Sequence, residues 1–350
     1  LSQAGLGRSL RRPSKGIQEF GQEFGIDNLT LTDQPDPEPR HGQIAIRVQA
    51  TSLNYRDLMT VKYGGMRGLK QPLIPLSDGA GEVVAIGAGV TRVKPGDRVA
   101  GIFFQNWLAG GSDASHAASA LGGALDGMLA EQVVLHEDGV VTIPDYMTYE
   151  DAAALPCAAV TAWHSMVTLG NMKAGETILI LGTGGVSIFA LQFAKAAGVR
   201  TIITSSSDEK LERAKQLGAS AMINYKTTPE WGKKVLALTD GVGVDQVVEV
   251  GGAGTLAQSM EAARVGGMVG LIGILAGTDG EVNPIPVLMK SLRLQGVYVG
   301  SRKMFEDMLT AMSINQIKPV IDTVYPFDEA RQALTLMEGA SHFGKIVIAG

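Results

Sequence analysis

The residues with the clearest chemical meaning form a glycine-rich turn between an apolar, strand-like run and an apolar helical pattern: Gly182-Thr183-Gly184-Gly185-Val186-Ser187. A dinucleotide site needs a first glycine for the sharp turn and a second so that the backbone can approach the pyrophosphate. The free N–H groups at the start of the following helix then receive the negative charge. The third glycine position holds Ser187 here. The turn predicts a nicotinamide-dinucleotide site, and a glycine turn without a ligand is the alternative.

The end of the next expected strand indicates which dinucleotide binds. An NAD site places a carboxylate about 20 residues after the glycines, where it bonds the ribose 2′-hydroxyl. Here the chain reads Thr204-Ser205-Ser206-Ser207, and Lys210 follows one helical turn later. Hydroxyls and a cation suit a 2′-phosphate better than a diol, so the sequence predicts NADPH, with NADH less favoured. The alternative for the serines is that they only cap the following helix.

A parallel sheet must position these residues. After about residue 150, apolar strand-like runs alternate with helical patterns, which predicts a doubly wound α/β sheet. The helix at 208–217 should begin with a capping box formed by Ser206 and Glu209, and another helix should follow Thr228. The expected strands are 178–181, 201–204, 222–224, 246–250 and 268–272.

The first part of the chain follows a different pattern. From residue 42 to about 144, apolar and polar residues alternate between turns rich in Gly, Pro and Asp, which predicts a mainly β domain. The segment 104–126 has the composition of a long loop, and such loops are often functional or mobile. The expected strands are 44–48, 81–86, 97–102 and 132–135, with a last one at 344–349.

Length and composition limit the function classes. The 350 residues exceed the usual size of one core, so two domains are expected. The net charge of −5 gives no electrostatic reason for a nucleic-acid or membrane partner. The single cysteine, Cys157, excludes an intrachain disulfide and favours a cytoplasmic location. The most apolar stretch, 178–197, contains glycines and polar residues and is a poor membrane span. Residues 1–16 are basic without apolar periodicity and are expected to form a tail.

Several further motifs give a family resemblance. They are the runs 52–57 (SLNYRD), 78–83 (DGAGEV), 93–99 (VKPGDRV) and 155–163 (LPCAAVTAW). With the glycine turn they resemble the medium-chain dehydrogenase/reductase superfamily, in its zinc-free, quinone-oxidoreductase-like or zinc-type alcohol dehydrogenase-like branch. The resemblance implies a GroES-like catalytic domain (17–145 and 300–350) around a Rossmann domain (146–299). It also implies an active site in the cleft between these domains.

The resemblance also indicates whether the chain has the residues that bind a catalytic zinc. Zinc-dependent members of the superfamily bind the catalytic metal through Cys, His and Cys, and the first two positions are Asn54 and Ser77 in this chain. Only the third, Cys157, keeps its thiol, and the acid that follows Ser77 is Asp78. Because a catalytic zinc needs about three protein ligands, no zinc is expected. Cys157 is expected to be a small buried residue.

The resemblance also assigns residues along the expected cleft. Tyr225 would lie beside the 2′-phosphate, and Asn54 and Thr161 would lie near the nicotinamide. The loops after the fourth and fifth Rossmann strands would pass the ribose and the nicotinamide, since ligands bind at the carboxyl ends of such strands. These loops contain Gly251 and the run Gly273-Ile274-Leu275.

Without a metal, hydrogen-bond donors must polarise the substrate oxygen. Tyr55 is the first candidate donor, with Asn54 and Arg56 behind it, and an ordinary packed tyrosine is the alternative. Hydride transfer from a dihydronicotinamide needs no covalent nucleophile. The sequence therefore predicts an NADPH-dependent oxidoreductase acting on a small carbonyl, enone or quinone. Two alternatives stay open: a non-enzymatic NADPH-binding sensor or structural protein, and a zinc-type alcohol dehydrogenase.

The run 292–299 reads as the last strand of the Rossmann sheet. An edge strand leaves unpaired backbone groups, and this one carries a single charge, Arg293, and no proline. The resemblance implies that the strand pairs with its twin across a two-fold axis. We therefore expect a homodimer through this strand. A monomer whose edge is covered by the C-terminal segment is the alternative.

Overall fold

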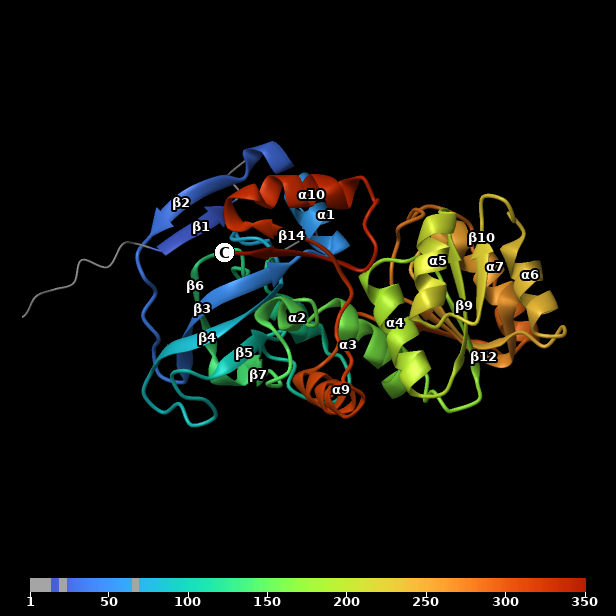
Figure 1. Ribbon diagram of the computed structural model, residues 1–350, viewed down its shortest axis with the longest axis horizontal. Helices are drawn as coiled ribbons and strands as arrows, with labels where there is room; N and C mark the ends of the chain where they lie inside the picture. The colour runs from blue at the N-terminus through green and yellow to red at the C-terminus, as the bar shows by residue number, and fades with distance from the viewer. Residues whose placement is uncertain (1–13, 19–23, 65–68) are drawn as a thin grey trace, which may run out of the picture.

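The computed structural model describes residues 14–18, 24–64 and 69–350, so most of the expected tail lies outside the described residues. Two lobes lie side by side along the long axis of the molecule (Figure 1). The C-terminus lies in the same lobe as the first strands. The chain therefore leaves this lobe, builds the second one, and returns.

The second lobe contains six parallel strands in the order β10-β9-β8-β11-β12-β13. This is the strand order of a Rossmann fold, with the change of direction between β8 and β11, and the predicted doubly wound sheet is confirmed. The strands are β8 (Thr177–Ile180), β9 (Arg200–Ser205), β10 (Ala221–Asn224), β11 (Val244–Glu249), β12 (Ala263–Leu271) and β13 (Arg293–Gly296). The helices are α4 (Gly185–Ala196), α5 (Asp208–Leu217), α6 (Trp231–Leu238), α7 (Ala253–Ala262) and α8 (Ile285–Met289).

The first lobe has the mainly β, GroES-like character that was predicted. Its sheet has the order β14-β15-β3-β4-β5-β7, and β6 also pairs with β3. Because β15 pairs antiparallel with β3, the C-terminal strands complete a sheet begun near the N-terminus. The strands are β3 (Gln43–Ser52), β4 (Asp78–Ile86), β5 (Arg98–Gly101), β6 (Gln132–His136), β7 (Val140–Thr142), β14 (Ile321–Pro326) and β15 (Lys345–Ala349).

Helices join the lobes and cover the first sheet. The helix α3 packs against both α4 and α9, which connects the two lobes. The π-helix His164–Leu169 continues α3 directly. The other helices of this part are α1 (Tyr55–Tyr63), α2 (Tyr149–Ala153), α3 (Ala158–Trp163), α9 (Arg302–Asn315) and α10 (Ala330–Glu338).

The structure differs from the sequence predictions at several places. The strand β1 (Ser14–Gln18) pairs with β2 (Thr30–Gln34), so a strand begins inside the segment expected to be a tail. The cap of α5 is Ser207, whose hydroxyl accepts from the N–H of Lys210, and not Ser206. The helix expected directly after Thr228 begins later, at Trp231, which is the first residue of α6.

The segment 104–126 was predicted to be a long loop of small residues. It contains a 3-10 helix, Ala114–Ser119, and buries Phe104 and Trp107. The indole N–H of Trp107 donates to the carbonyl of Gly110. The segment is thus packed onto the core of the molecule, because its few aromatic residues are directed inward.

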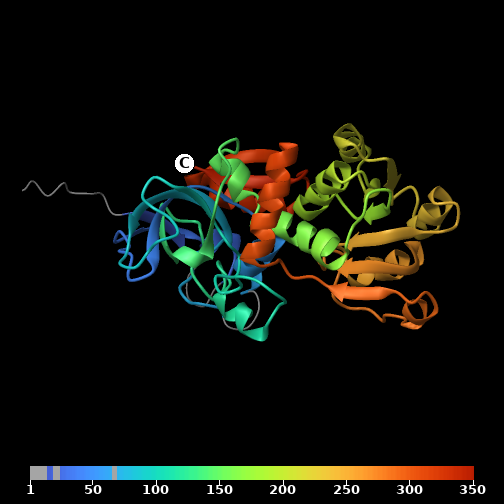
Figure 2. The ribbon, with the colours of Figure 1, turned by 90° about the horizontal axis from the view of Figure 1, so that it is seen from below.

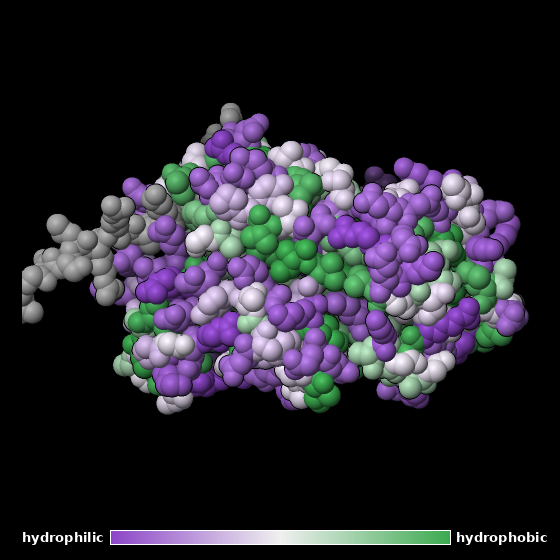
Figure 3. All heavy atoms as spheres, in the orientation of Figure 1, coloured by the Kyte–Doolittle hydropathy of each residue, from purple (hydrophilic) through white to green (hydrophobic). Residues whose placement is uncertain are grey.

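Two groups of apolar residues lie on the surface of the molecule. Apolar residues form a band across the centre of the face shown in Figure 3, between the two lobes. A second apolar group lies on α8, where Ile285, Leu288 and Met289 are mainly exposed. In the part of the chain that the structure describes, no helix is long and apolar enough to cross a membrane.

Candidate active site

The glycine turn connects the end of β8 to the start of α4 and leaves open space beside it. Gly182 has a φ of 72°, a backbone conformation that favours glycine. A Cβ atom added to Gly184 would meet no atom within 4 Å. Gly184 is the N-cap of α4 and provides no side-chain hydrogen bond to the helix N–H groups. Open space beside free N–H groups fits the pyrophosphate of a dinucleotide.

The other side chains of the turn have packing roles in the structure. The hydroxyl of Ser187 is buried and donates to the carbonyl of Leu181 at 2.6 Å. It fastens the first turn of α4 to the end of β8. The carbonyl of Thr183 accepts from the N–H of Gly344. Val186 packs against the hydrophobic core.

The predicted 2′-phosphate residues converge at the carboxyl ends of β9 and β10. The N–H of Tyr225 donates to the carbonyl of Ser205, which brings the aromatic residue beside the serines. Ser206 is half-buried and free of the capping role expected for it. Lys210 Nζ donates to the carbonyl of Ala340 at 2.9 Å. Burial lowers the pKa of Lys210, and the nearby Asp322 opposes this effect.

The expected nicotinamide loops are organised by Glu249, a fully buried residue at the end of β11 that the sequence analysis missed. Its carboxylate accepts from the N–H groups of Gly251 and Gly252, at 2.6 and 3.1 Å. The segment Gly273-Ile274-Leu275 follows β12 beside them, and Leu275 donates its N–H to the carbonyl of Val250. The hydroxyl of Thr161 donates to the carbonyl of Cys157.

Asn54 and Tyr55 lie at the start of α1. Asn54 is buried, caps the helix, and donates its N–H to the carboxylate of Asp57 at 2.9 Å. Burial raises the pKa of Asp57, and the adjacent Arg56 guanidinium opposes the rise. Tyr55 is 41% exposed and is therefore more open to solvent than Asn54.

The three positions compared with zinc ligands do come together. The side-chain N–H of Asn54 lies 3.5 Å from the hydroxyl of Ser77, which donates to Asp78. The N–H of Cys157 donates to the same carboxylate. Burial raises the pKa of the Cys157 thiol, which therefore stays protonated. The Nζ atom of Lys345 reaches this cluster and donates to the side-chain oxygen of Asn54 at 2.7 Å.

Two family profiles match the chain, one described as the alcohol dehydrogenase GroES-like domain over residues 40–145 and one as zinc-binding dehydrogenase over residues 185–313. A zinc-type alcohol dehydrogenase-like protein of Schizosaccharomyces pombe is 42% identical over 331 residues, which cover 93% of this chain and 96% of the relative. The chain belongs to the medium-chain dehydrogenase/reductase superfamily. It is an NAD(P)-dependent oxidoreductase of this superfamily, as predicted.

Further relatives and solved structures match nearly the whole chain. An acryloyl-coenzyme A reductase of Metallosphaera sedula is 26% identical over 342 residues, 95% of this chain and 99% of that relative. A Sinorhizobium meliloti protein assigned as an alcohol dehydrogenase has a TM-score of 0.89 at 41% identity, covering 96% of this chain and 99% of its own. An NAD-dependent alcohol dehydrogenase has a TM-score of 0.87 at 32% identity, with coverage of 96% and 99%. A mycobacterial protein in complex with NADPH has a TM-score of 0.81 at 25% identity, with coverage of 96% and 100%.

An aromatic wall lies beside the Asn54 cluster. The ring of Tyr298 packs edge-on against Phe103 and Phe104, with centroids 6.0 and 5.3 Å apart. The guanidinium of Arg56 lies over the ring of Phe103. Partial burial raises the pKa of Tyr298, and Arg56 opposes this rise. Tyr298 is more than 190 residues from Phe103 in the chain, so these ring contacts depend on how the chain folds back.

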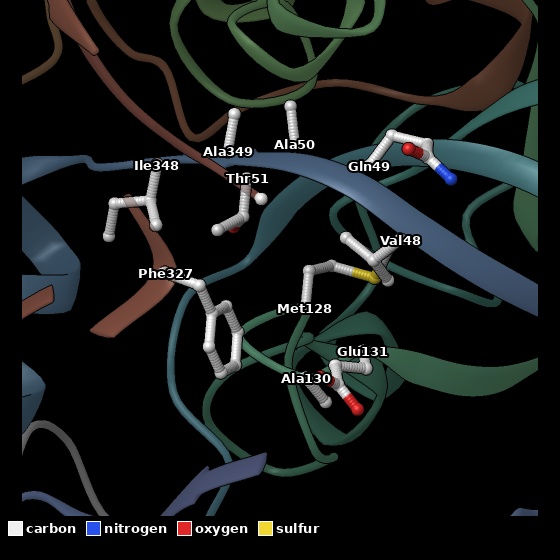
Figure 4. Close-up of a pocket in the computed structure, with 11 residues that line it drawn as sticks. Val48, Gln49, Ala50, Thr51, Met128, Ala130, Glu131, Phe327, Ile348 and Ala349 are labelled. Atoms are coloured by element: carbon white, nitrogen blue, oxygen red, sulfur yellow. The ribbon is translucent and has the colours of Figure 1, made fainter. Parts of the chain in front are cut away.

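A small pocket lies elsewhere, in the GroES-like lobe. Met128 and Phe327 face each other across it, next to Val48 and Thr51 of β3 (Figure 4). Its volume is about 50 Å³, whereas sites for small molecules usually enclose roughly 300–1,000 Å³. None of the predicted site residues lines it. The open space beside the glycine turn, and not this pocket, is therefore the candidate site.

Proposed function

We propose that the chain is an NADPH-dependent reductase that adds a hydride to a carbonyl, enone or quinone substrate without zinc. The observation that carries the proposal is the ammonium group of Lys345 within the cluster of Asn54, Asp78 and Cys157. Zinc-dependent relatives are expected to hold their metal at this position. A buried cation next to an amide can assist a developing oxyanion without a Lewis acid.

The cofactor preference is supported by the residues at the ends of β9 and β10. Ser205 and Ser206 occupy the place where an NAD site has its carboxylate, and Lys210 and Tyr225 flank them. Serine hydroxyls and a lysine favour a 2′-phosphate, which carries negative charge. The similar structures include one named NAD-dependent and one in complex with NADPH, so the residues of this chain decide the preference.

The donor set does not fit zinc. Asn54 offers an amide oxygen that already accepts from Lys345, so only Cys157 of the three compared positions keeps a side chain that zinc favours. Asp78 already accepts from Ser77 and from the backbone of Cys157. Among the described residues, no group of three His, Cys, Asp or Glu side chains could hold a metal ion. A site with fewer than three suitable ligands is a poor zinc site.

The residues of the chain would divide the work of the reaction among them. NADPH, when bound, supplies the hydride. Asn54 would donate a hydrogen bond to the substrate oxygen, and the exposed hydroxyl of Tyr55 is the candidate proton donor. Phe103, Phe104 and Tyr298 would exclude water from one side of the substrate. Quinones, enones and aldehydes share the electrophilic carbon and the oxygen that this arrangement needs.

We also propose the division of the chain expected from the sequence. Residues 17–145 and 300–350 would form the GroES-like catalytic domain, and 146–299 the Rossmann domain. The pairing of β14 and β15 with β3 supports the assignment of the C-terminal segment. The contact of α9 with α3 lies at the boundary between the two.

A homodimer through β13 is part of the proposal. β13 lies at the edge of the Rossmann sheet, and all four of its residues are exposed. It is the outermost strand in Figure 2, drawn in orange with α8 beside it. An exposed edge strand next to the apolar residues Leu288 and Met289 is a good interface between two copies.

A turnover screen tests the proposal. The protein is incubated with NADPH or NADH and a panel of quinones, enones and aldehydes, and cofactor oxidation is followed at 340 nm. Turnover with NADPH, unaffected by chelators and without stoichiometric zinc by metal analysis, is expected. Tight NADPH binding without turnover of any substrate would instead favour a sensor or structural protein. One tightly bound zinc per chain, with Cys157 as ligand, would contradict the zinc-free site.

A further inference from the structure

Lys345 is a buried lysine to which the sequence analysis gave no role. It begins β15, and its side chain is 2% exposed. Its ammonium group donates to the carbonyl of Leu53 and to the side-chain oxygen of Asn54, each at 2.7 Å. It lies 3.9 Å from a carboxylate oxygen of Asp78. A buried ammonium group is costly unless oxygens surround it, and these three oxygens compensate for its burial.

The contact with Lys345 determines how the amide of Asn54 is oriented. An ammonium group can only donate hydrogen bonds, so it selects the conformer in which the amide oxygen faces it. The NH₂ group of Asn54 then points away, toward the hydroxyl of Ser77 at a long distance of 3.5 Å. An amide nitrogen carries two N–H donors. At least one of them is left for a ligand in the cleft.

The distances also show that Lys345 does more than neutralise the charge of Asp78. A lysine that only neutralised Asp78 would lie within direct hydrogen-bonding distance of it, at about 2.8 Å. Lys345 is instead closer to Asn54 than to Asp78. The carboxylate is already bonded by the hydroxyl of Ser77 and by the backbone N–H of Cys157. The lysine is thus directed at the amide.

We propose that Lys345 is a positioning residue that fixes the Asn54 amide so that its N–H donates to the substrate oxygen. This inference rests on the proposed reductase function. In the step it assists, bound NADPH would supply a hydride and become NADP⁺, and a C–H bond would form at the substrate carbon. The π electrons of the C=O bond, or of the conjugated C=C–C=O system, move to the oxygen, which later takes a proton. The positive charge of Lys345, acting through the amide, stabilises this oxygen as it becomes negative.

The first test replaces Lys345 with a neutral side chain of similar length. Lys345→Met should lower kcat for a substrate that the parent reduces by 10- to 100-fold. The Kd for NADPH, measured by fluorescence, should change by less than threefold. The matched control is Lys318→Met, which removes an exposed lysine paired with Asp151 at 3.6 Å and should leave kcat unchanged. An unchanged kcat in Lys345→Met would overturn the inference.

A double-mutant cycle shows whether Lys345 acts through Asn54. Asn54→Ala should lower kcat by itself, and adding Lys345→Met should lower it by less than a further twofold. Multiplicative losses would mean that the two residues act independently and would contradict the inference. Thermal unfolding of every variant is measured in parallel.

Lys345→Met leaves the negative charge of Asp78 buried without a nearby cation, which can prevent folding. A double variant that removes both charges is therefore a further test. The double variant Lys345→Met, Asp78→Asn removes both charges and should fold while keeping the loss of kcat. Recovery of the parental kcat would show that the lysine only balanced charge. If the parent reduces no substrate, the proposed function fails. Crystal structures of the parent and of the double variant then still test how the Asn54 amide is oriented. Without the lysine, the amide oxygen and the NH₂ group of Asn54 should exchange places. An amide that keeps its orientation overturns the inference.

Discussion

The backbone N–H of Gly344 donates a hydrogen bond of 3.0 Å to the carbonyl of Thr183, and these two residues join the lobes at the cofactor turn. Gly344 also forms an isolated parallel bridge with Gly184. The next residue, Lys345, packs its side chain against Gly185 and reaches Asn54. One short segment of the GroES-like lobe thus contacts both the expected pyrophosphate site and the expected substrate site. The two expected sites therefore lie next to each other along one backbone segment.

The open space at the glycine turn predicts that valine will have different effects at Gly184 and at Gly185. Gly184→Val should fold normally, because its backbone is extended and its Cβ would meet no atom, yet it should lose NADPH binding. Gly185→Val should instead lower the melting temperature, because a Cβ there would lie 2.8 Å from the Lys345 side chain. Melting curves and fluorescence titration check both. NADPH binding by Gly184→Val within a few-fold of the parent would contradict the site.

Lys210 should select between the two cofactors. Lys210→Ala is expected to weaken NADPH binding roughly tenfold or more, since a charge-assisted hydrogen bond contributes about 1.5–3 kcal/mol. Binding of NADH should change by less than about twofold because it lacks the 2′-phosphate. The matched control is Lys215→Ala, which removes an exposed lysine of the same helix. Equal losses for both cofactors, measured by titration, would argue against the assignment.

His342 should make the stability of the fold sensitive to mild acid. Burial lowers its pKa to about 4, and the nearby Lys210 and Lys345 add to the effect, while Asp322 opposes it. Its Nδ1 atom is buried, and no described residue forms a hydrogen bond with it. Because the folded pKa lies below the unfolded value of about 6.5, the unfolded state binds more protons between these values. The stability contributed by neutral His342 is therefore lost as the pH falls from about 6.5 to 4.

The measurement is urea unfolding at about pH 7 and pH 4.5. His342→Gln should lose less stability between these conditions than the parent, by on the order of 2 kcal/mol. His41→Gln, which changes an exposed histidine, should follow the parent. Parallel losses in the parent and His342→Gln would show that this histidine does not contribute.

The sequence predicts the parts of the site that depend on local chemistry. A glycine turn between a strand and a helix is a local pattern, and the residues from Gly182 to Ser187 lie where that pattern requires. The strand ends that bring Ser205 and Tyr225 together follow from apolar runs in the same way. The cap of α5 was misplaced by one residue, because three consecutive serines offer the same hydroxyl and only the backbone conformation selects Ser207.

Contacts between distant segments could not be read in this way. Lys345 is separated from Asn54 by 291 residues, and nothing near either residue indicates that they meet. A lysine in a terminal strand is ordinarily expected at the surface. The packing of Tyr298 on Phe104 depends on how the chain returns to the first lobe. Glu249 was missed because no sequence motif marks its partners, which are backbone N–H groups and side-chain hydroxyls.

The apolar edge formed by β13 and α8 should hold two copies of the chain together. Leu288 is 77% exposed, and Leu288→Asp is expected to dissociate the dimer by placing a charge in a desolvated interface. The matched control is Ile314→Asp, because Ile314 on α9 is equally exposed, at 77%, and lies on a different element. Size-exclusion chromatography with light scattering should give the parent and the control twice the 36.7 kDa chain mass, and Leu288→Asp the single mass. A parent that stays at the single mass at micromolar concentrations would show that the edge is left unpaired or covered within one chain.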